Sequence, residues 1–156
     1  MFFKKERQFA FSPVSGKVIN LEDVNDDVFS KKMMGEGVAI IPDEMQIVSP
    51  FNCTVTAVLD SNHAIGLTTD DGIEVIVHVG LDTVNLKGRG FKCFVNEGDI
   101  VKVGDQLLAF DKDVIEAEGY DTITMLVVSN TNSKQIVIME NLDLAKAGQT
   151  KIIEFI

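Results

Sequence analysis

His63 and His78 are the only two histidines in the chain, and they are the side chains best suited to chemistry. A neutral imidazole, with an ordinary pKa of about 6.5, carries a free lone pair near neutral pH and can attack an electrophile such as phosphorus. A second imidazole beside the first can donate a hydrogen bond to the phosphoryl oxygens. Ser61 precedes His63 by two residues, and its hydroxyl can orient a ring. These residue types suit a nucleophilic site that handles phosphate.

The two histidines belong to neighbouring strand-like segments that are separated by Asp70-Asp71-Gly72. Asp-Gly is a preferred central pair of a two-residue hairpin turn. If Asp71 and Gly72 form that pair, Ile65 lies opposite His78, and both imidazoles share one face as diagonal neighbours. A three-residue loop with an odd register would place the rings on opposite faces instead.

The second segment of this hairpin alternates in a way that separates a core face from a site face. One face consists of valines and is predicted to be buried: Val75, Val77 and Val79. His78 then projects from the other face, beside Ile76 and Ile65, which indicates an exposed apolar concavity. A pair of ordinary structural histidines is the alternative interpretation.

The rest of the chain predicts an all-β fold. Strand-like runs alternate with Gly- and Asp-containing turns along its length. The runs are 17–21, 38–41, 54–59, 73–79, 106–110, 124–128 and 135–139. Short helices are expected only at 113–118 and 26–32. We therefore expect a predominantly antiparallel β-sandwich or partly closed barrel.

A weak internal repeat suggests that this fold contains two related halves. The segment Ser12-Pro-Val-Ser-Gly-Lys-Val18 is echoed by Ser49-Pro-Phe-Asn-Cys-Thr-Val55. In each copy a proline precedes a small residue and a β-branched strand position, which is typical of a turn that enters a strand. We expect two similar hairpin units that pack together, within a single domain over 9–156 that follows a flexible tail over 1–8.

Composition excludes several classes of function. With 156 residues, 46% of them hydrophobic, the chain can bury a core, and its net charge of −10 disfavours nucleic acid as a partner. No apolar run is long enough to cross a bilayer, and the N-terminus lacks the pattern of a secretory signal, so a cytoplasmic protein is expected. Cys53 and Cys93 lack metal-site spacing and are expected to be free thiols, although a disulfide between them is not excluded by the sequence.

Several segments together resemble the glucose-family enzyme IIA domain of the bacterial phosphoenolpyruvate:sugar phosphotransferase system. The most specific is the stretch H-x-G-x-D-T-V-x-L-x-G-x-G-F, which begins at His78 and ends at Phe91. Shorter matches are Asp26-Asp-Val-Phe29, Met34-Gly-Glu-Gly-Val-Ala-Ile40 and Asn62-His-Ala64. The resemblance extends from about Phe9 to Ile153.

The resemblance implies a phosphoryl carrier that needs no cofactor. His78 would be phosphorylated at Nε2 by the phosphocarrier protein HPr. His63 would stabilise the phosphoryl group and be required for its transfer to a cysteine of an enzyme IIB domain. Gly80 would accept a hydrogen bond from Nδ1 of His78, and Ser61 replaces a family threonine that hydrogen-bonds within the site.

The same resemblance implies a docking surface around the histidines. Asp26 and Asp82 match family acids that meet arginine on HPr. The residues that match the apolar docking rim are Val28, Phe29, Met34 and Val84, to which the hairpin argument adds Ile65 and Ile76. Neither cysteine has the motif of a IIB acceptor. Whether the chain is a free-standing protein or part of a longer permease stays open.

Three other functions compete with the carrier. A zinc metallopeptidase is suggested by the H-x-x-x-D spacing of His78 and Asp82, but that chemistry takes three protein ligands and this peptidase family needs an H-x-H that the chain lacks. A zinc ion held by His63 and His78, adventitious or shared with a partner, is more plausible. A biotin or lipoyl carrier is suggested by residues 96–108, without the modified-lysine motif. A regulatory module that signals through the phosphorylation state of His78 is the third.

Overall fold

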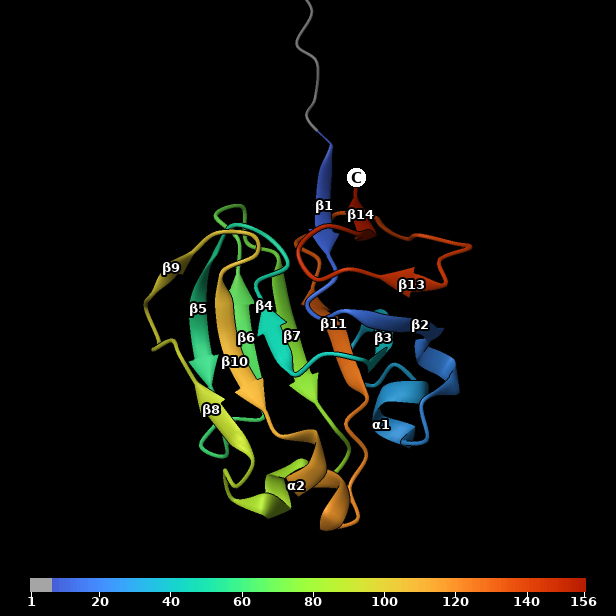
Figure 1. Ribbon diagram of the computed structural model, residues 1–156. Helices are drawn as coiled ribbons and strands as arrows, with labels where there is room; N and C mark the ends of the chain where they lie inside the picture. Colours follow the sequence, from blue (N-terminus) through green and yellow to red (C-terminus); the bar gives the residue numbers. More distant parts are fainter. Residues whose placement is uncertain (1–6) are drawn as a thin grey trace, which may run out of the picture.

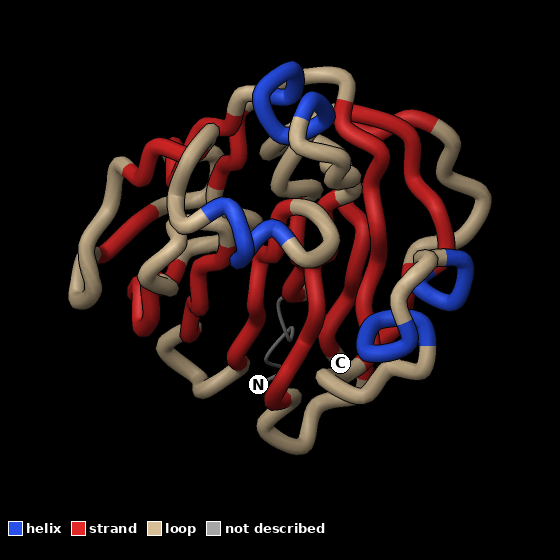
Figure 2. Tube along the Cα trace, turned by 90° about the horizontal axis from the view of Figure 1, so that it is seen from below, coloured by secondary structure: helices blue, strands red, loops and turns tan. Residues whose placement is uncertain are grey.

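The structure, a computed structural model, describes residues 7–156 and consists mainly of β-strands (Figures 1 and 2). The strands are β1 (Gln8–Phe11), β2 (Gly16–Asn20), β3 (Glu36–Pro42), β4 (Gln46–Val48), β5 (Cys53–Val58), β6 (Ala64–Thr68), β7 (Glu74–Val79), β8 (Phe91–Cys93), β9 (Ile100–Val101), β10 (Gln106–Phe110), β11 (Thr124–Asn130), β12 (Ile136–Ile138), β13 (Leu144–Ala145) and β14 (Lys151–Phe155). The short helical elements are η1 (Leu21–Asp23), α1 (Asp27–Ser30), η2 (Thr83–Leu86) and α2 (Lys112–Ala117). The predicted all-β class is confirmed.

The strands form one large sheet and two small ones. The large sheet has the order β13-β2-β3-β11-β7-β6-β5-β9, and the small sheets have the orders β1-β14-β12 and β4-β10-β8. All recorded strand pairs are antiparallel. Because β13 and β9 are open edges of the large sheet, the fold is a sandwich and not a closed barrel.

The two faces of the large sheet contact different hydrophobic clusters. The main core lies between the large sheet and the small sheets, and it contains the fully buried valines Val75, Val77 and Val79 that the alternation predicted. On the opposite face, a smaller cluster forms where η1 and α1 cover β3 and β11. Phe29 of α1 and Met125 of β11 belong to this second cluster. The smaller cluster is the one that borders His78.

The strand order reveals two halves related by a pseudo-two-fold axis. Read from its edges inward, the large sheet gives β13-β2-β3-β11 on one side and β9-β5-β6-β7 on the other. Each half then has its own three-stranded sheet, β1-β14-β12 or β4-β10-β8. One half is continuous from β4 to β10, and it is inserted between β3 and β11 of the other. The predicted internal repeat is confirmed in this form.

Equivalent hydrogen bonds join the two Ser-Pro segments. Each serine hydroxyl donates to the carbonyl two residues later at 2.7 Å, Ser12 to Val14 and Ser49 to Phe51. The segments also bond to each other at 2.8 Å through a backbone N–H and a prolyl carbonyl, Phe11 to Pro50 and Val48 to Pro13. The repeat in the sequence therefore marks the contact between the two halves.

The β6–β7 hairpin differs from the predicted register by one residue. Ala64 lies opposite His78, and the loop contains three residues, Asp70 to Gly72. Thr69 closes this loop, because its hydroxyl oxygen accepts a hydrogen bond from the Ile73 N–H at 3.0 Å. The prediction of a two-residue turn was wrong because this side-chain contact favours the longer loop.

The register also corrects the position of Ile65. This residue lies opposite Val77, on the core face of the sheet, and its side chain is fully buried. The prediction that Ile65 lines an exposed concavity beside His78 was therefore wrong. Side chains alternate along a strand, so a shift of one residue moves Ile65 from one face to the other.

The N-terminal boundary of the fold lies slightly earlier than expected, and both cysteines are free. Residues 1–6 of the expected tail lie outside the described residues, whereas Gln8 is already part of β1. Arg7 forms an ion pair with Glu154 at 2.6 Å. Cys53 and Cys93 are free thiols. Within the described part of the chain, no helix is long and apolar enough to cross a membrane.

Candidate functional site

The two histidine rings contact each other at one end of the β6–β7 hairpin. Their centroids are 4.9 Å apart, and the ring planes meet edge to face at 87°. Strict alternation in the observed register would separate the rings, but His63 precedes the first residue of β6. Asn62 before it has a left-handed backbone with φ of 56°. His63 is therefore free of the strand alternation, and the predicted ring contact exists although the predicted register does not.

Backbone hydrogen bonds fix His63 relative to the strand that carries His78. The carbonyl of His63 accepts a hydrogen bond from the Val79 N–H at 2.8 Å. Its side chain is only 3% exposed, and its ring lies 6.4 Å from the ring of Phe91. The backbone of His63 is thus bonded to Val79, the residue after His78. Its ring lies near Phe91, the last residue of the H-x-G-x-D-T-V-x-L-x-G-x-G-F motif.

The ring of His78 lies between the large sheet and α1. Its strand neighbour across the β7–β11 pair is Met125, and the ring of Phe29 lies 5.0 Å away at a tilt of 57°. Asp26 caps α1, because its carboxylate accepts a hydrogen bond from the Val28 N–H at 2.9 Å. The cap fixes the residue at which α1 begins, and this start places Phe29 against the His78 ring.

Gly80 allows the chain to turn sharply directly after His78. Its φ is +83°, and a Cβ atom there would lie 2.4 Å from Cγ2 of Thr83 and 2.6 Å from the carbonyl oxygen of Asp121. Only glycine fits this position without moving its neighbours. The hydroxyl of Thr83 donates to the Val79 carbonyl at 2.6 Å. Gly80 and Thr83 of the motif therefore fix the backbone on the C-terminal side of His78.

Both imidazoles are neutral at physiological pH. Burial, with the proximity of His63 as the second cause, lowers the pKa of His78 to about 4. The backbone of Gly80 and the carboxylate of Asp26 act in the opposite direction. Burial also lowers the pKa of His63. Each ring therefore keeps a free lone pair near pH 7.

The two nitrogens of each ring differ in access to solvent. Nδ1 of His63 and Nδ1 of His78 are buried and have no hydrogen-bond partner. Neither Nε2 is among the buried unpartnered atoms. Gly80 acts on the His78 ring through a backbone hydrogen bond that raises the pKa, although Nδ1 and Gly80 do not have the geometry of a full hydrogen bond. Nε2 is thus the nitrogen that an incoming group can reach.

The remaining predicted residues lie at different depths. Val28 and Val84 are 41% and 52% exposed, whereas Phe29 is 5% exposed and supports the ring from below. Met34 and Ile76 are half-buried, Asp26 is partly exposed, and Asp82 is exposed with a left-handed φ of 58°. The Ser61 hydroxyl donates to the Val84 carbonyl at 3.3 Å, so it orients the η2 segment and not a histidine ring.

Sequence reasoning did not single out Thr83, Phe91 or Met125 as neighbours of the histidines. Thr83 and Phe91 were inside the quoted motif, so a signal for them existed. Met125 lay in a segment recognised only as a strand, and its place opposite His78 depends on the pairing of β7 with β11. Such long-range pairing leaves no local pattern.

The described residues offer no complete metal site. Within residues 7–156, no group of three or more histidine, cysteine, aspartate or glutamate side chains could hold a metal ion. A structural or catalytic zinc takes three or four protein ligands, and His63 with His78 supply two. The zinc alternative therefore has no support from this structure.

The sequence of the chain matches one family of known proteins. Residues 9–134 match the family described as phosphoenolpyruvate-dependent sugar phosphotransferase system, EIIA 1. The chain belongs to this family, and it is accordingly a component of a phosphotransferase system.

Individual relatives agree with this family. The chain is 41% identical over 160 residues to the PTS system glucose-specific EIIA component of Oceanobacillus iheyensis, across 100% of this chain and 97% of that protein. It is 47% identical over 126 residues to the PTS system beta-glucoside-specific EIIBCA component of Bacillus subtilis, across 81% of this chain and 21% of that protein. The solved structure of glucose permease IIA from Mycoplasma capricolum superimposes with a TM-score of 0.90 at 28% identity and covers 99% of both chains.

Proposed function

We propose that the protein carries a phosphoryl group on Nε2 of His78, receives it from HPr in the cytoplasm and passes it to a cysteine of an enzyme IIB domain during sugar uptake. The observation that carries this proposal is the state of His78. Its ring is neutral, its Nδ1 is enclosed, and its Nε2 is the accessible nitrogen. A nucleophile for phosphorus needs a free lone pair on an accessible atom.

The transfer step uses the two rings in different roles. The lone pair of His78 Nε2 forms a bond to phosphorus while the bond from phosphorus to the HPr nitrogen breaks, and that electron pair returns to HPr. The ring proton of His78 stays on Nδ1, where the Gly80 carbonyl becomes its acceptor as the ring loses electron density; catalytic hydrogen bonds often tighten only in the reacting complex. His63, 4.9 Å away, donates to the phosphoryl oxygens.

The surroundings of the site suit docking to another protein. Val28, which precedes the ring partner Phe29, and Val84, which accepts a hydrogen bond from Ser61, are exposed. A phosphohistidine is labile in water, so an apolar rim that is covered by a partner protects it during transfer. Asp26, whose carboxylate acts on His78, and the exposed Asp82, four residues after His78, supply negative charge that fits a basic surface on HPr.

Intact-mass spectrometry after incubation with phosphoenolpyruvate, enzyme I and HPr tests this proposal. The wild-type chain should gain one acid-labile phosphoryl group, and His78→Gln should gain none. His63→Gln should still accept the group but transfer it poorly to an enzyme IIB domain, because the phosphoryl oxygens lose a donor. Normal phosphorylation of the His78→Gln variant would overturn the assignment.

A further inference from the structure

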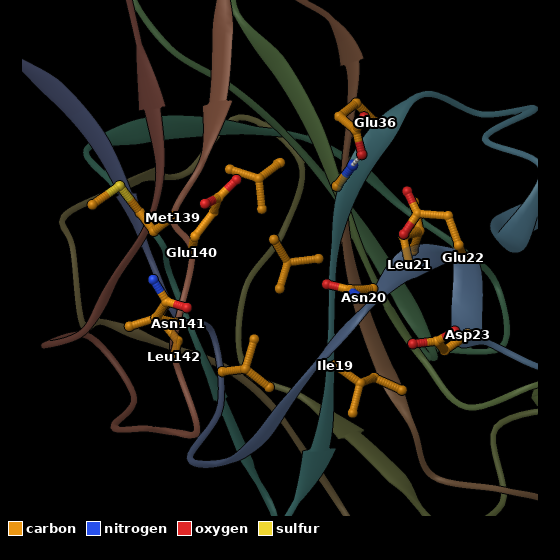
Figure 3. Close-up of a pocket in the computed structure, with 14 residues that line it drawn as sticks. Ile19, Asn20, Leu21, Glu22, Asp23, Glu36, Met139, Glu140, Asn141 and Leu142 are labelled. Carbon is orange, nitrogen blue, oxygen red and sulfur yellow. Dashed lines mark hydrogen bonds between the residues drawn. The ribbon is translucent and has the colours of Figure 1, made fainter.

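A pocket of about 610 Å³, shown with its lining residues in Figure 3, has a lining separate from the histidine site. Its walls are the end of β2 with η1, the first residues of β3, and the segment 138–142 that connects β12 to β13. Neither histidine lines it, and none of the residues assigned above to the docking rim does so. The pocket is therefore a feature that the proposed phosphoryl transfer does not use.

The lining of this pocket combines aliphatic side chains with carboxylates on two facing walls. Glu140 extends from one wall, whereas Glu22, Asp23 and Glu36 extend from the other (Figure 3). The aliphatic side chains on the main-core face of this lining are Val18, Val38, Ile138 and Leu142, whereas Ile19 and Leu21 pack in the smaller cluster on the opposite face. An occupant must therefore present an apolar stem and a positive end.

An ion pair within the protein shows that the wall with Glu22 and Glu36 binds an ammonium group. The ammonium of Lys32 lies 2.6 Å from a carboxylate oxygen of Glu22 and 2.8 Å from one of Glu36. Asp23 and Glu140 form no side-chain hydrogen bond or ion pair with other residues of the 7–156 region. Lys32 thus neutralises part of the wall, and Asp23 and Glu140 keep their charges available.

We propose that this pocket is a docking site for a basic segment of a partner protein, which inserts a lysine or arginine side chain. The methylene stem of such a side chain packs on aliphatic surface while its head stays with carboxylates, which matches the two kinds of lining. Charge complementarity at this rim selects a cationic partner and orients it. The site is additional to the phosphoryl transfer proposed above and does not depend on it.

The direct test is a titration of the isotopically labelled full chain, followed by NMR. The probe is an acetylated, amidated hexapeptide of alternating lysine and alanine. Amide shifts should concentrate at residues 20–23 and 139–142. The double variant Asp23→Asn with Glu140→Gln should bind the peptide roughly tenfold more weakly, because it loses two ion pairs.

A matched control separates this site from general attraction to an acidic protein. The double variant Glu44→Gln with Asp70→Asn removes the same charge at exposed turns outside the pocket, and it should change peptide affinity by less than about twofold. Equal weakening by both double variants, or shifts spread over the whole surface, would overturn the proposal. Tighter binding of free spermidine than of the peptide would also overturn it, because the pocket would then be a polyamine site.

A measurement of phosphoryl acceptance by the same variant distinguishes the docking proposal from the histidine proposal. Asp23 and Glu140 are not among the residues that surround the rings of His63 and His78. The double variant Asp23→Asn with Glu140→Gln should therefore accept phosphate from HPr as the wild type does. Loss of acceptance in this variant would contradict a separate docking site. Failure of the wild type to accept phosphate would instead refute the carrier assignment and leave the peptide titration unaffected.

Discussion

At the scale of single residues, the site depends on an imidazole that folding keeps neutral. His78 lies under Phe29 and against Met125, and burial is the main reason why its pKa falls to about 4. The same burial encloses Nδ1 and leaves Nε2 for chemistry. One cause therefore sets the protonation state and favours Nε2 as the reactive atom that we propose.

The lowered pKa of His78 predicts a specific dependence of stability on pH. Below pH about 6.5 the unfolded chain binds a proton on this residue that the folded chain does not bind until pH about 4. The free energy of unfolding should therefore fall as the pH is lowered through this window, by up to about 3 kcal/mol, and should be unaffected by His78 above it.

Urea unfolding at pH 7 and pH 4.5 measures this effect. The wild type should lose about 2 kcal/mol more than His78→Gln between the two pH values, because the variant has no imidazole to protonate. His63 contributes in the same direction in both proteins, and so do the carboxylates. Parallel losses in the two proteins would show that the His78 ring is not held neutral by the fold.

At the scale of elements, the positions of the histidines combine local patterns with long-range pairing. The alternation of Val75, Val77 and Val79 predicted the core face of β7 correctly. The hairpin loop was mispredicted because Asp71 is also bound by Lys134, at 3.0 Å, from a distant part of the sequence. The left-handed Asn62 then directs His63 toward His78. No two-residue pattern in the sequence encodes these long-range contacts.

Other strands were predicted or missed from the sequence for similar reasons. Strands with several consecutive apolar residues, such as β10 and β11, were predicted close to their observed bounds. The very short β9 and β13 were missed, since two paired residues leave no periodicity to detect. Ile65 was misplaced on the docking rim, because its face depends on the register of the β6–β7 pair.

The contact between η2 and β7 leads to a prediction about Thr83. Its buried hydroxyl holds the Val79 carbonyl, so Thr83→Val should leave that acceptor unpaired and cost about 1–3 kcal/mol of stability. Thr83→Ser keeps the hydroxyl and should retain most of the phosphoryl acceptance rate that Thr83→Val loses. Urea unfolding and the rate of phosphorylation by HPr measure both effects. Identical behaviour of the serine and valine variants would contradict a role for the hydroxyl.

At the scale of the whole molecule, the pseudo-two-fold arrangement explains why the histidine site lies near the middle of the large sheet. The axis passes between β7 and β11, the central pair, and His78 lies on that pair opposite Met125. Strands from both halves thus support the residue that carries the proposed chemistry. The inserted half supplies both histidines, and the outer half supplies Phe29 and Met125.

The symmetry predicts equal costs for equivalent substitutions. Ser12 and Ser49 are both fully buried and make the same hydrogen bond in the two halves. Ser12→Ala and Ser49→Ala should each lower the free energy of unfolding by about 1–3 kcal/mol, since each leaves a buried carbonyl unpaired. Chemical denaturation should give values for the two variants that agree within about 1 kcal/mol. A neutral effect of one variant beside a large effect of the other would show that the two segments are not equivalent.

The most direct test of phosphoryl transfer through His78 is to identify the phosphorylated nitrogen. NMR of the chain labelled with ¹⁵N in histidine, recorded after phosphorylation by HPr, detects coupling between nitrogen and phosphorus. We expect coupling to Nε2 of His78 and to no nitrogen of His63. Coupling to Nδ1 of His78, or to either nitrogen of His63, would contradict it.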